Sequence, residues 1–138
     1  MLKTTNVIDA LLHAIETADV TTELFTDDAV LDATVPNWRF EVRGRDDVTE
    51  QLRDWFADPG NFETVRREPL PHGELVEFTL HWNENGIPHA CHQAHILELS
   101  DGRISRDTAF CGGRWPADLL ARMAASSYLQ ERPAAQNK

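Results

Sequence analysis

The chain has 138 residues, 41% of them hydrophobic and 26% charged, which predicts one globular domain with a buried core. The formal net charge is −10 and the Lys and Arg residues are scattered, so nucleic acid and anionic membranes are disfavoured as partners. The sequence has no run of about 18 apolar residues and no signal-peptide pattern, which predicts a cytoplasmic protein. In that compartment Cys91 and Cys111 are expected to be buried free thiols.

The first half of the sequence predicts a helix, a short helix, two strands and a third helix. Val7, Leu11 and Ile15 recur at the helical period, so one face of a helix over residues 5–18 is expected to be buried. The segment "RDDVTEQLRDWF" starts with an Asp cap and carries apolar residues at the same period before "DPG" ends it. The short helix, the two strands and the third helix are expected at residues 21–25, 27–36, 38–44 and 45–56.

The second half predicts four long strands separated by the turn signals "PHG", "NENG" and "SDG". Strands joined by such short turns are antiparallel. A last helix over residues 116–129 is expected to close a single domain over 1–131, followed by a frayed tail over 132–138. The fold class is therefore α+β, with helices over a curved mixed or antiparallel sheet. The four strands are expected at residues 62–70, 74–82, 87–99 and 103–111.

Several of these segments, in this order, resemble a known superfamily. The segments "ELFTDDAVLDATVPNW", "RGRDDVTEQLRDWF" and "LSDGRISRDTAF", with the long hairpins between them, resemble the nuclear transport factor 2-like superfamily, in particular its SnoaL-like branch and the ketosteroid isomerases. The resemblance covers roughly residues 5–125. It implies a conical α+β barrel that encloses a pocket open at one end. It implies no single chemistry, because the superfamily includes isomerases, cyclases, epoxide hydrolases, dehydratases and proteins that only bind or dimerise.

Three histidines lie at every third position of "HACHQAHILEL". Side chains alternate between the two faces of a strand, so His89 and His95 share one face and His92 points to the other. Three imidazoles that cannot converge do not form a three-ligand metal site. The sequence therefore predicts no metal and no organic cofactor.

The face that carries His95 has the composition of a pocket wall. Either a two-residue or a four-residue loop across "NENG" leaves Phe78, Leu80 and Trp82 on the same face as His95. This face is apolar with a few polar groups, whereas the opposite face, with His81 and His92, is expected to meet solvent or a partner subunit. The candidates for substrate binding are Leu31, Trp38, Phe78, Leu80, Trp82, Cys91, Gln93 and Cys111.

The length of the next turn decides what faces His95. A two-residue Asp101-Gly102 loop would place Arg106 on the apolar wall and Asp107 on the outer face. A three-residue loop that includes Ser100 would place His95 opposite Asp107 inside the cavity, and it is favoured because it keeps Arg106 off the wall. Such a pair can pass a proton in either direction, so His95 and Asp107 are the candidate catalytic residues. A buried His-Asp pair can equally be a structural contact.

The resemblance supports this pair and also marks departures from the family. SnoaL-like cyclases are similar in using an inward histidine and aspartate on these two strands. Ala33 stands where ketosteroid isomerases carry their base, and Ala109 stands where epoxide hydrolases of this fold carry an acid. Asp32 is next to Ala33 but alternates outward unless its strand bulges.

The expected function is that of a small cofactor-independent enzyme. It would act by acid/base proton transfer on an apolar, oxygenated, polyketide- or steroid-like substrate, by cyclisation, isomerisation or dehydration, which the sequence does not rank. The alternative is a non-catalytic ligand-binding or dimerisation module of the same fold. The outer face of the sheet carries Ile96, Ile104 and Phe110, which predicts a homodimer through that face.

Overall fold

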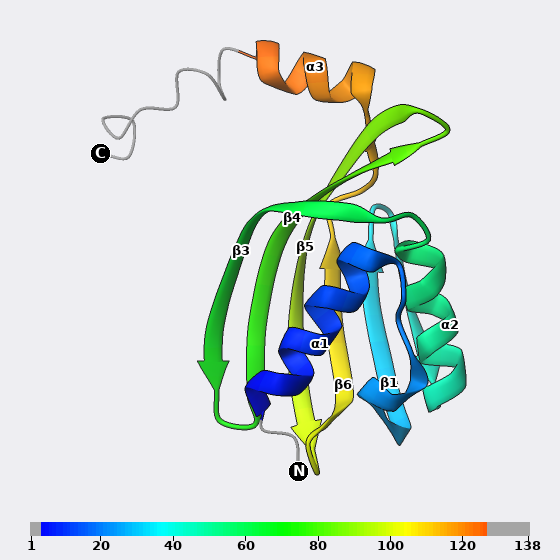
Figure 1. Ribbon diagram of the computed structural model, residues 1–138, viewed down its shortest axis with the longest axis vertical. Coiled ribbons are helices and arrows are strands. Elements are labelled where there is room, and N and C mark those ends of the chain that lie inside the picture. The colour runs from blue at the N-terminus through cyan, green and yellow to red at the C-terminus, as the bar shows by residue number, and fades with distance from the viewer. Residues whose placement is uncertain (1–3, 127–138) are drawn as a thin grey trace.

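The computed structural model describes residues 4–126 (Figure 1). The domain end expected at residue 131, the end of the last helix at residue 129 and the tail over residues 132–138 lie outside the described residues. In chain order the elements are α1 (Thr4–Thr17), the 3-10 helix η1 (Thr22–Leu24), β1 (Phe25–Val35), β2 (Trp38–Arg43), α2 (Arg45–Trp55), β3 (Gly60–Leu70), β4 (Gly73–Glu84), β5 (Ile87–Ser100), β6 (Arg103–Cys111), β7 (Trp115–Pro116) and α3 (Ala117–Ala125).

The strands form one mixed, open sheet in the order β2-β1-β6-β5-β4-β3, and β7 pairs with β5 beside this row. The consecutive strands from β3 to β6 are antiparallel, as predicted, whereas β1 runs parallel to β6. Helix α1 lies across one face of the sheet, and α2 lies beside β1 (Figure 1). The predicted α+β class is therefore confirmed. Within the described residues, no helix has both the length and the apolar character needed to cross a bilayer.

The core lies between the helices and the sheet. Val7, Leu11 and Ile15 of α1 are buried, as the helical period predicted. Leu52 of α2 is buried in the same core. Each such side chain contributes about 1.5–3 kcal/mol by leaving water. Because α1 and α2 cover the inner face of the sheet, side chains that point inward from β4, β5 and β6 meet the core or a cavity within it.

The turn between β4 and β5 consists of Asn85 and Gly86, with φ angles of 53° and 79°. Two positive φ angles define a type I′ turn, whose twist matches that of the flanking strands, and Asn-Gly is its preferred sequence. The turn places His95 opposite Val76 in the register of the two strands. The alternation predicted for this hairpin is therefore present, and His95 points into the core.

The turn between β5 and β6 differs from the favoured prediction. Only Asp101 and Gly102, with φ angles of 54° and 78°, connect the strands, so the three-residue loop was wrong. The register then shifts by one residue, because Leu99 pairs with Ile104 and Glu98 pairs with Arg106. This bulge restores the inward direction of Asp107, which the two-residue loop alone would have turned outward.

The two-residue turn and the bulge also change the expected register and the place of one hydrophobic side chain. Asp107 lies opposite Leu97, and His95 lies opposite Ala109, two residues from the predicted register. Ile104 is fully buried on the inner face, so its assignment to the outer face was wrong. Phe110 remains on the outer face and is 46% exposed.

Candidate functional site

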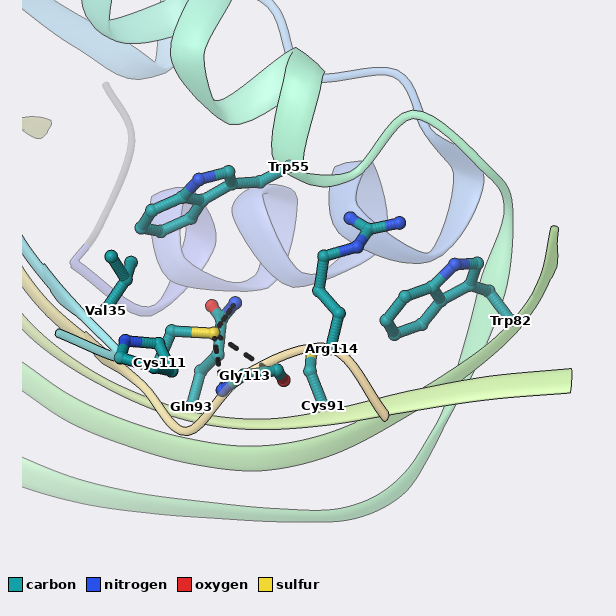
Figure 2. Close-up of a pocket in the computed structure, with 9 residues that line it drawn as sticks. Val35, Trp55, Trp82, Cys91, Gln93, Cys111, Gly113 and Arg114 are labelled. Atoms are coloured by element: carbon teal, nitrogen blue, oxygen red, sulfur yellow. Dashed lines mark hydrogen bonds between the residues drawn. The ribbon is translucent and has the colours of Figure 1, made fainter. Parts of the chain in front are cut away.

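An apolar cavity of about 240 Å³ lies between the end of α2 and the strands β4, β5 and β6 (Figure 2). Trp55 projects into it from α2, and the floor is formed by strand residues that point inward from the sheet. The polar side-chain groups of its lining residues are two thiols, one amide, one guanidinium and two indole N–H groups. A mainly apolar wall with a few polar groups is typical of small-molecule sites. The lining residues are Val35, Pro36, Trp55, Trp82, Cys91, Gln93, Cys111, Gly113 and Arg114.

Arg114 supplies the positive charge of this cavity, and it contacts Trp82 and Glu84. The guanidinium of Arg114 lies 5.1 Å from the ring centroid of Trp82. It also forms an ion pair with Glu84, which accepts a 2.9 Å hydrogen bond from Trp82 Nε1. The Trp82 hydrogen bond and the charge of Arg114 lower the pKa of Glu84, although burial opposes them. Glu84 is therefore ionised at neutral pH and neutralises Arg114.

A hydrogen-bonded pair lies beneath the cavity floor. The Nδ1 atom of His95 is 2.8 Å and 3.0 Å from the two carboxylate oxygens of Asp107, and both side chains are 2% exposed. The imidazole stacks on the ring of Phe78, with centroids 5.5 Å apart and an interplanar angle of 15°. The pair expected from the sequence forms, but as a diagonal contact rather than between directly opposed residues.

The amide of Gln93 connects this pair to the cavity. Its Oε1 atom is 2.8 Å from His95 Nε2, and its Nε2 atom donates to Cys111 Sγ at 3.4 Å. The backbone N–H of Gly113 donates to the same sulfur, also at 3.4 Å. Figure 2 shows Gln93 and Cys111 side by side on the floor of the cavity, below Trp55. A hydrogen-bonded chain therefore runs from Asp107 in the core to a sulfur atom on the cavity wall.

Two arrangements of protons satisfy this chain. With the amide as placed, both ring nitrogens of His95 donate, one to Asp107 and one to Gln93, and Cys111 Sγ accepts two N–H groups. With the amide reversed, its NH₂ group donates to a neutral His95 and its oxygen accepts the S–H of Cys111. The orientation of Gln93 therefore couples the charge on the imidazole to the state of the thiol.

The structure separates the predicted binding residues into two layers. Trp82, Cys91, Gln93 and Cys111 line the cavity, whereas Leu31, Phe78 and Leu80 are buried in the core and do not line it. Trp38 was wrongly placed on the cavity wall. It is 69% exposed, although it pairs with the lining residue Val35, because it starts the edge strand β2 beyond the cover of α2.

Five lining residues were missed. Val35, Pro36, Gly113 and Arg114 lie where strands end, and strand alternation does not describe such positions. For Trp55 the available signal was the helical period of the apolar residues in "RDDVTEQLRDWF", but the sequence did not show that this face of the helix ends over a cavity.

The two cysteines differ in their surroundings. Burial of Cys91 and, to a lesser degree, its neighbour Cys111 raise the pKa of the Cys91 thiol to about 12. Cys91 is 3% exposed, so it remains a neutral thiol at physiological pH. Cys111 is only partly buried, and both cysteines are free.

The remaining titratable candidates lie on the outer face. His92 bonds to Thr79 at 2.7 Å and to Glu77 at 2.8 Å. Asp32 points outward, where Arg39 binds it through two nitrogens at 2.8 Å and 3.0 Å. The hydrogen bond from Arg39 lowers the pKa of Asp32, so this carboxylate is ionised and paired away from the cavity. Among residues 4–126, no three His, Cys, Asp or Glu side chains are grouped as a metal site.

Comparison with known proteins identifies a family. The family model of the SnoaL-like domain matches residues 8–107. No curated protein sequence matches the chain. Solved structures of other proteins are similar to the chain in fold, and three of them illustrate the likeness. An NTF2-like protein from Anabaena variabilis has a TM-score of 0.68 at 11% identity, with 79% of this chain and 86% of that chain covered.

A Bacillus subtilis protein provisionally named an isomerase has a TM-score of 0.65 at 17% identity, with 79% of this chain and 86% of that chain covered. A Xanthomonas campestris protein provisionally named a polyketide cyclase has a TM-score of 0.60 at 16% identity, with 78% of this chain and 88% of that chain covered. At these identities the likeness concerns the fold alone.

Proposed function

Because the chain belongs to the SnoaL-like domain family, we propose that its cavity is the active site of a cofactor-independent enzyme of the cytoplasm. The enzyme transfers protons within a small, apolar, oxygenated substrate of polyketide-like chemistry. Cyclisation, isomerisation and loss of water all require this step. The observation that carries the proposal is the hydrogen-bonded chain from Asp107 through His95 to Gln93 on the floor of an apolar cavity.

Each residue of this chain has a distinct role. The carboxylate of Asp107 accepts the Nδ1–H of His95 and thereby orients the ring and fixes its tautomer. In the neutral imidazole, the free electron pair then lies on Nε2, the atom that faces Gln93. Nε2 reaches a substrate when the Gln93 side chain rotates away, so Gln93 controls access of the base to the cavity.

The volume of the cavity limits the substrate. About 240 Å³ is below the range of roughly 300–1,000 Å³ that is typical of pockets for drug-sized ligands. The indoles of Trp55 and Trp82 favour a flat apolar body. A compound of one or two rings therefore suits this cavity better than a four-ring steroid skeleton.

A second candidate function is that of a non-catalytic ligand-binding module. It is favoured by the position of Gln93, which separates His95 from the cavity. In the described part of the chain, no buried side-chain nitrogen or oxygen is without a hydrogen-bond partner, so the pair needs no substrate to be satisfied. In this case the cavity binds a ligand and no proton moves.

The test has two stages. A screen of small cyclic ketones, enones and phenols by thermal shift identifies a ligand, because binding to the folded state raises the melting temperature. Conversion of that ligand is then followed with His95→Gln and with His81→Gln, a matched change at an exposed histidine on the outer face.

Under the enzyme proposal, His95→Gln abolishes turnover and His81→Gln retains it, since an amide cannot carry a proton at neutral pH. Turnover that survives His95→Gln contradicts the role of His95. Binding without conversion by the unmodified protein supports the binding module instead.

A further inference from the structure

Two sulfur atoms line the cavity, and they differ in reactivity for structural reasons. The thiolate is the nucleophilic form of cysteine, and reactive cysteines are partly exposed and lie near donors or cations. Cys91 is 3% exposed, and burial keeps it a neutral thiol. Cys111 is partly exposed and lines the cavity. The sulfur of Cys111 is therefore the accessible nucleophile on the cavity wall.

The backbone after β6 is shaped around the sulfur of Cys111. Gly113 has a φ angle of 119°, which allows its N–H to turn back onto Sγ, two residues earlier in the chain. A Cβ atom at this position would be strained and would lie 3.3–3.4 Å from Trp115 and Pro36, so glycine is required. Gln93 supplies the second N–H donor. Two N–H groups directed at one sulfur complement a negative charge on it.

We propose that Cys111 is a nucleophilic residue of this cavity and that its sulfur adds to the β-carbon of an apolar α,β-unsaturated carbonyl compound. The proposal rests on the proposed function only in that both place the ligand in the same cavity.

The reaction balances without an oxidant or a cofactor. A C–S bond forms at the β-carbon, the C=C π bond breaks, and its electron pair moves onto the carbonyl oxygen as an enolate. The thiol loses its proton to solvent at the cavity mouth, and one proton returns to the α-carbon when the enolate collapses. The product is a thioether, and the reverse reaction releases the ligand unchanged.

The other groups of the cavity suit this class of ligand. The indoles of Trp55 and Trp82 accept the flat conjugated body of an enone. Negative charge develops on the carbonyl oxygen during the addition, and the donors available on the wall are the Gln93 amide and the Arg114 guanidinium. Figure 2 shows the Arg114 side chain extending between the two indoles.

The test measures adduct formation by intact-mass spectrometry and locates the adduct by peptide mapping. The probes are benzalacetone, an apolar enone, and acrylamide, a small polar acceptor. The variant C111S removes the nucleophile. The variant C111S/E98C carries an exposed thiol on the β5–β6 hairpin and serves as the benchmark, because position 98 is exposed. The unmodified protein unfolded in urea reports the unassisted rate of both thiols.

The expected result is a single adduct at Cys111 in the native protein, with a rate that saturates as the benzalacetone concentration rises. The preference for benzalacetone over acrylamide is at least about tenfold greater than at the exposed thiol, a difference of about 1.4 kcal/mol. Native Cys111 that reacts no faster than the unfolded chain, or a rate that rises linearly without saturation, overturns the proposal. Modification of Cys91 first also overturns it.

Gln93→Leu tests the donor to the sulfur. It is expected to slow the addition at Cys111 about tenfold and to change its pH profile, while the rate in urea stays the same. Failure of this proposal is distinguishable from failure of the proposed function. Benzalacetone that raises the melting temperature of both the native protein and C111S without adding mass overturns covalent addition and leaves the cavity a ligand site.

Discussion

His95 is held in the core because each of its ring nitrogens has a partner. Asp107 meets Nδ1 and Gln93 meets Nε2, at 2.8 Å each. Strand alternation predicted that His95 points inward, since that rule depends only on the spacing of residues along one strand. It did not predict the intervening Gln93 amide, because a hydrogen bond between residues two apart on one face depends on side-chain rotation.

Replacement of Asp107 separates the loss of a partner from the loss of charge. Asp107→Ala leaves the Nδ1–H of His95 unpaired in a site that is 2% exposed, which is expected to cost about 1–3 kcal/mol in the free energy of unfolding, in addition to the cavity created. Asp107→Asn keeps a carbonyl oxygen as acceptor and is expected to cost less. Urea denaturation of both variants measures this, and equal losses would contradict a hydrogen-bonding role for Asp107.

Cys91 predicts a dependence of stability on alkaline pH. Its pKa is about 12 in the folded protein and about 8.5 in an unfolded chain, so the folded state holds the proton more tightly. The resulting stability is fully present below the unfolded pKa and is lost as the pH rises toward the folded value, by at most about 1.4 kcal/mol per pH unit.

Urea denaturation of the native protein and of Cys91→Ala at pH 7, 9 and 10.5 isolates this contribution. The native protein is expected to lose more stability than the variant between pH 9 and pH 10.5. Parallel curves would show that Cys91 ionises in the folded protein as it does in water.

Among the elements, the β5–β6 hairpin shows how local rules combine. The Asp101-Gly102 turn has the sequence preference of a two-residue turn, and that local preference is satisfied. A two-residue turn alone would bury Arg106, and a bulge at Ser105 avoids that burial. No feature of the sequence marks this bulge, because Ser105 resembles an ordinary strand residue.

The bulge predicts different outcomes for two deletions in β6. Deletion of Ser105 removes the extra residue and leaves Asp107 facing inward. The free energy of unfolding is then expected to fall by about 1 kcal/mol, because the hydrogen bond from the Ser105 hydroxyl to the backbone oxygen of Glu98 is lost. Deletion of Thr108 puts the two halves of β6 out of phase, so that either Arg106 turns inward and Asp107 outward, or Phe110 turns inward and Cys111 outward. It is expected to cost about 3–5 kcal/mol. Denaturation curves compare the two deletions, and equal destabilisation would contradict the bulge.

At the scale of the whole molecule, none of the described residues 4–126 covers the exposed side chain of Phe110 on the outer face of the sheet. Phe110 is 46% exposed there, and its cross-strand neighbour is Ala94, with the half-buried Ile96 next along β5. We propose that a second copy of the chain covers this face, because a large aromatic side chain on an uncovered sheet favours association.

Sedimentation at tens of micromolar, a usual working range, is expected to give twice the chain mass of 15.6 kDa. Phe110→Asp is expected to give a monomer with the same secondary structure, since it places a charge in the interface. A monomeric native protein would refute the dimer.

The α+β class followed from periodicity and turn signals, which report on each element separately. The cavity depends on where elements end: Trp55 ends α2, Val35 ends β1, and Arg114 follows β6. End positions are set by packing between elements, so the sequence predicted which strand face lines a cavity but not its other walls. The prediction for Trp38 failed for the same reason. Trp38 is on the inward face of its strand, but it lies at the end of the strand, where its side chain is exposed.

The most direct test of the cavity as the functional site is a crystal structure with the best ligand from the thermal-shift screen. The expected result is a ligand in the cavity with one oxygen about 3 Å from the Gln93 amide and the Asp107–His95 contact retained. A ligand bound elsewhere, with the Gln93 amide still bonded to His95 and Cys111 and the cavity without ligand, would contradict the assignment of the site.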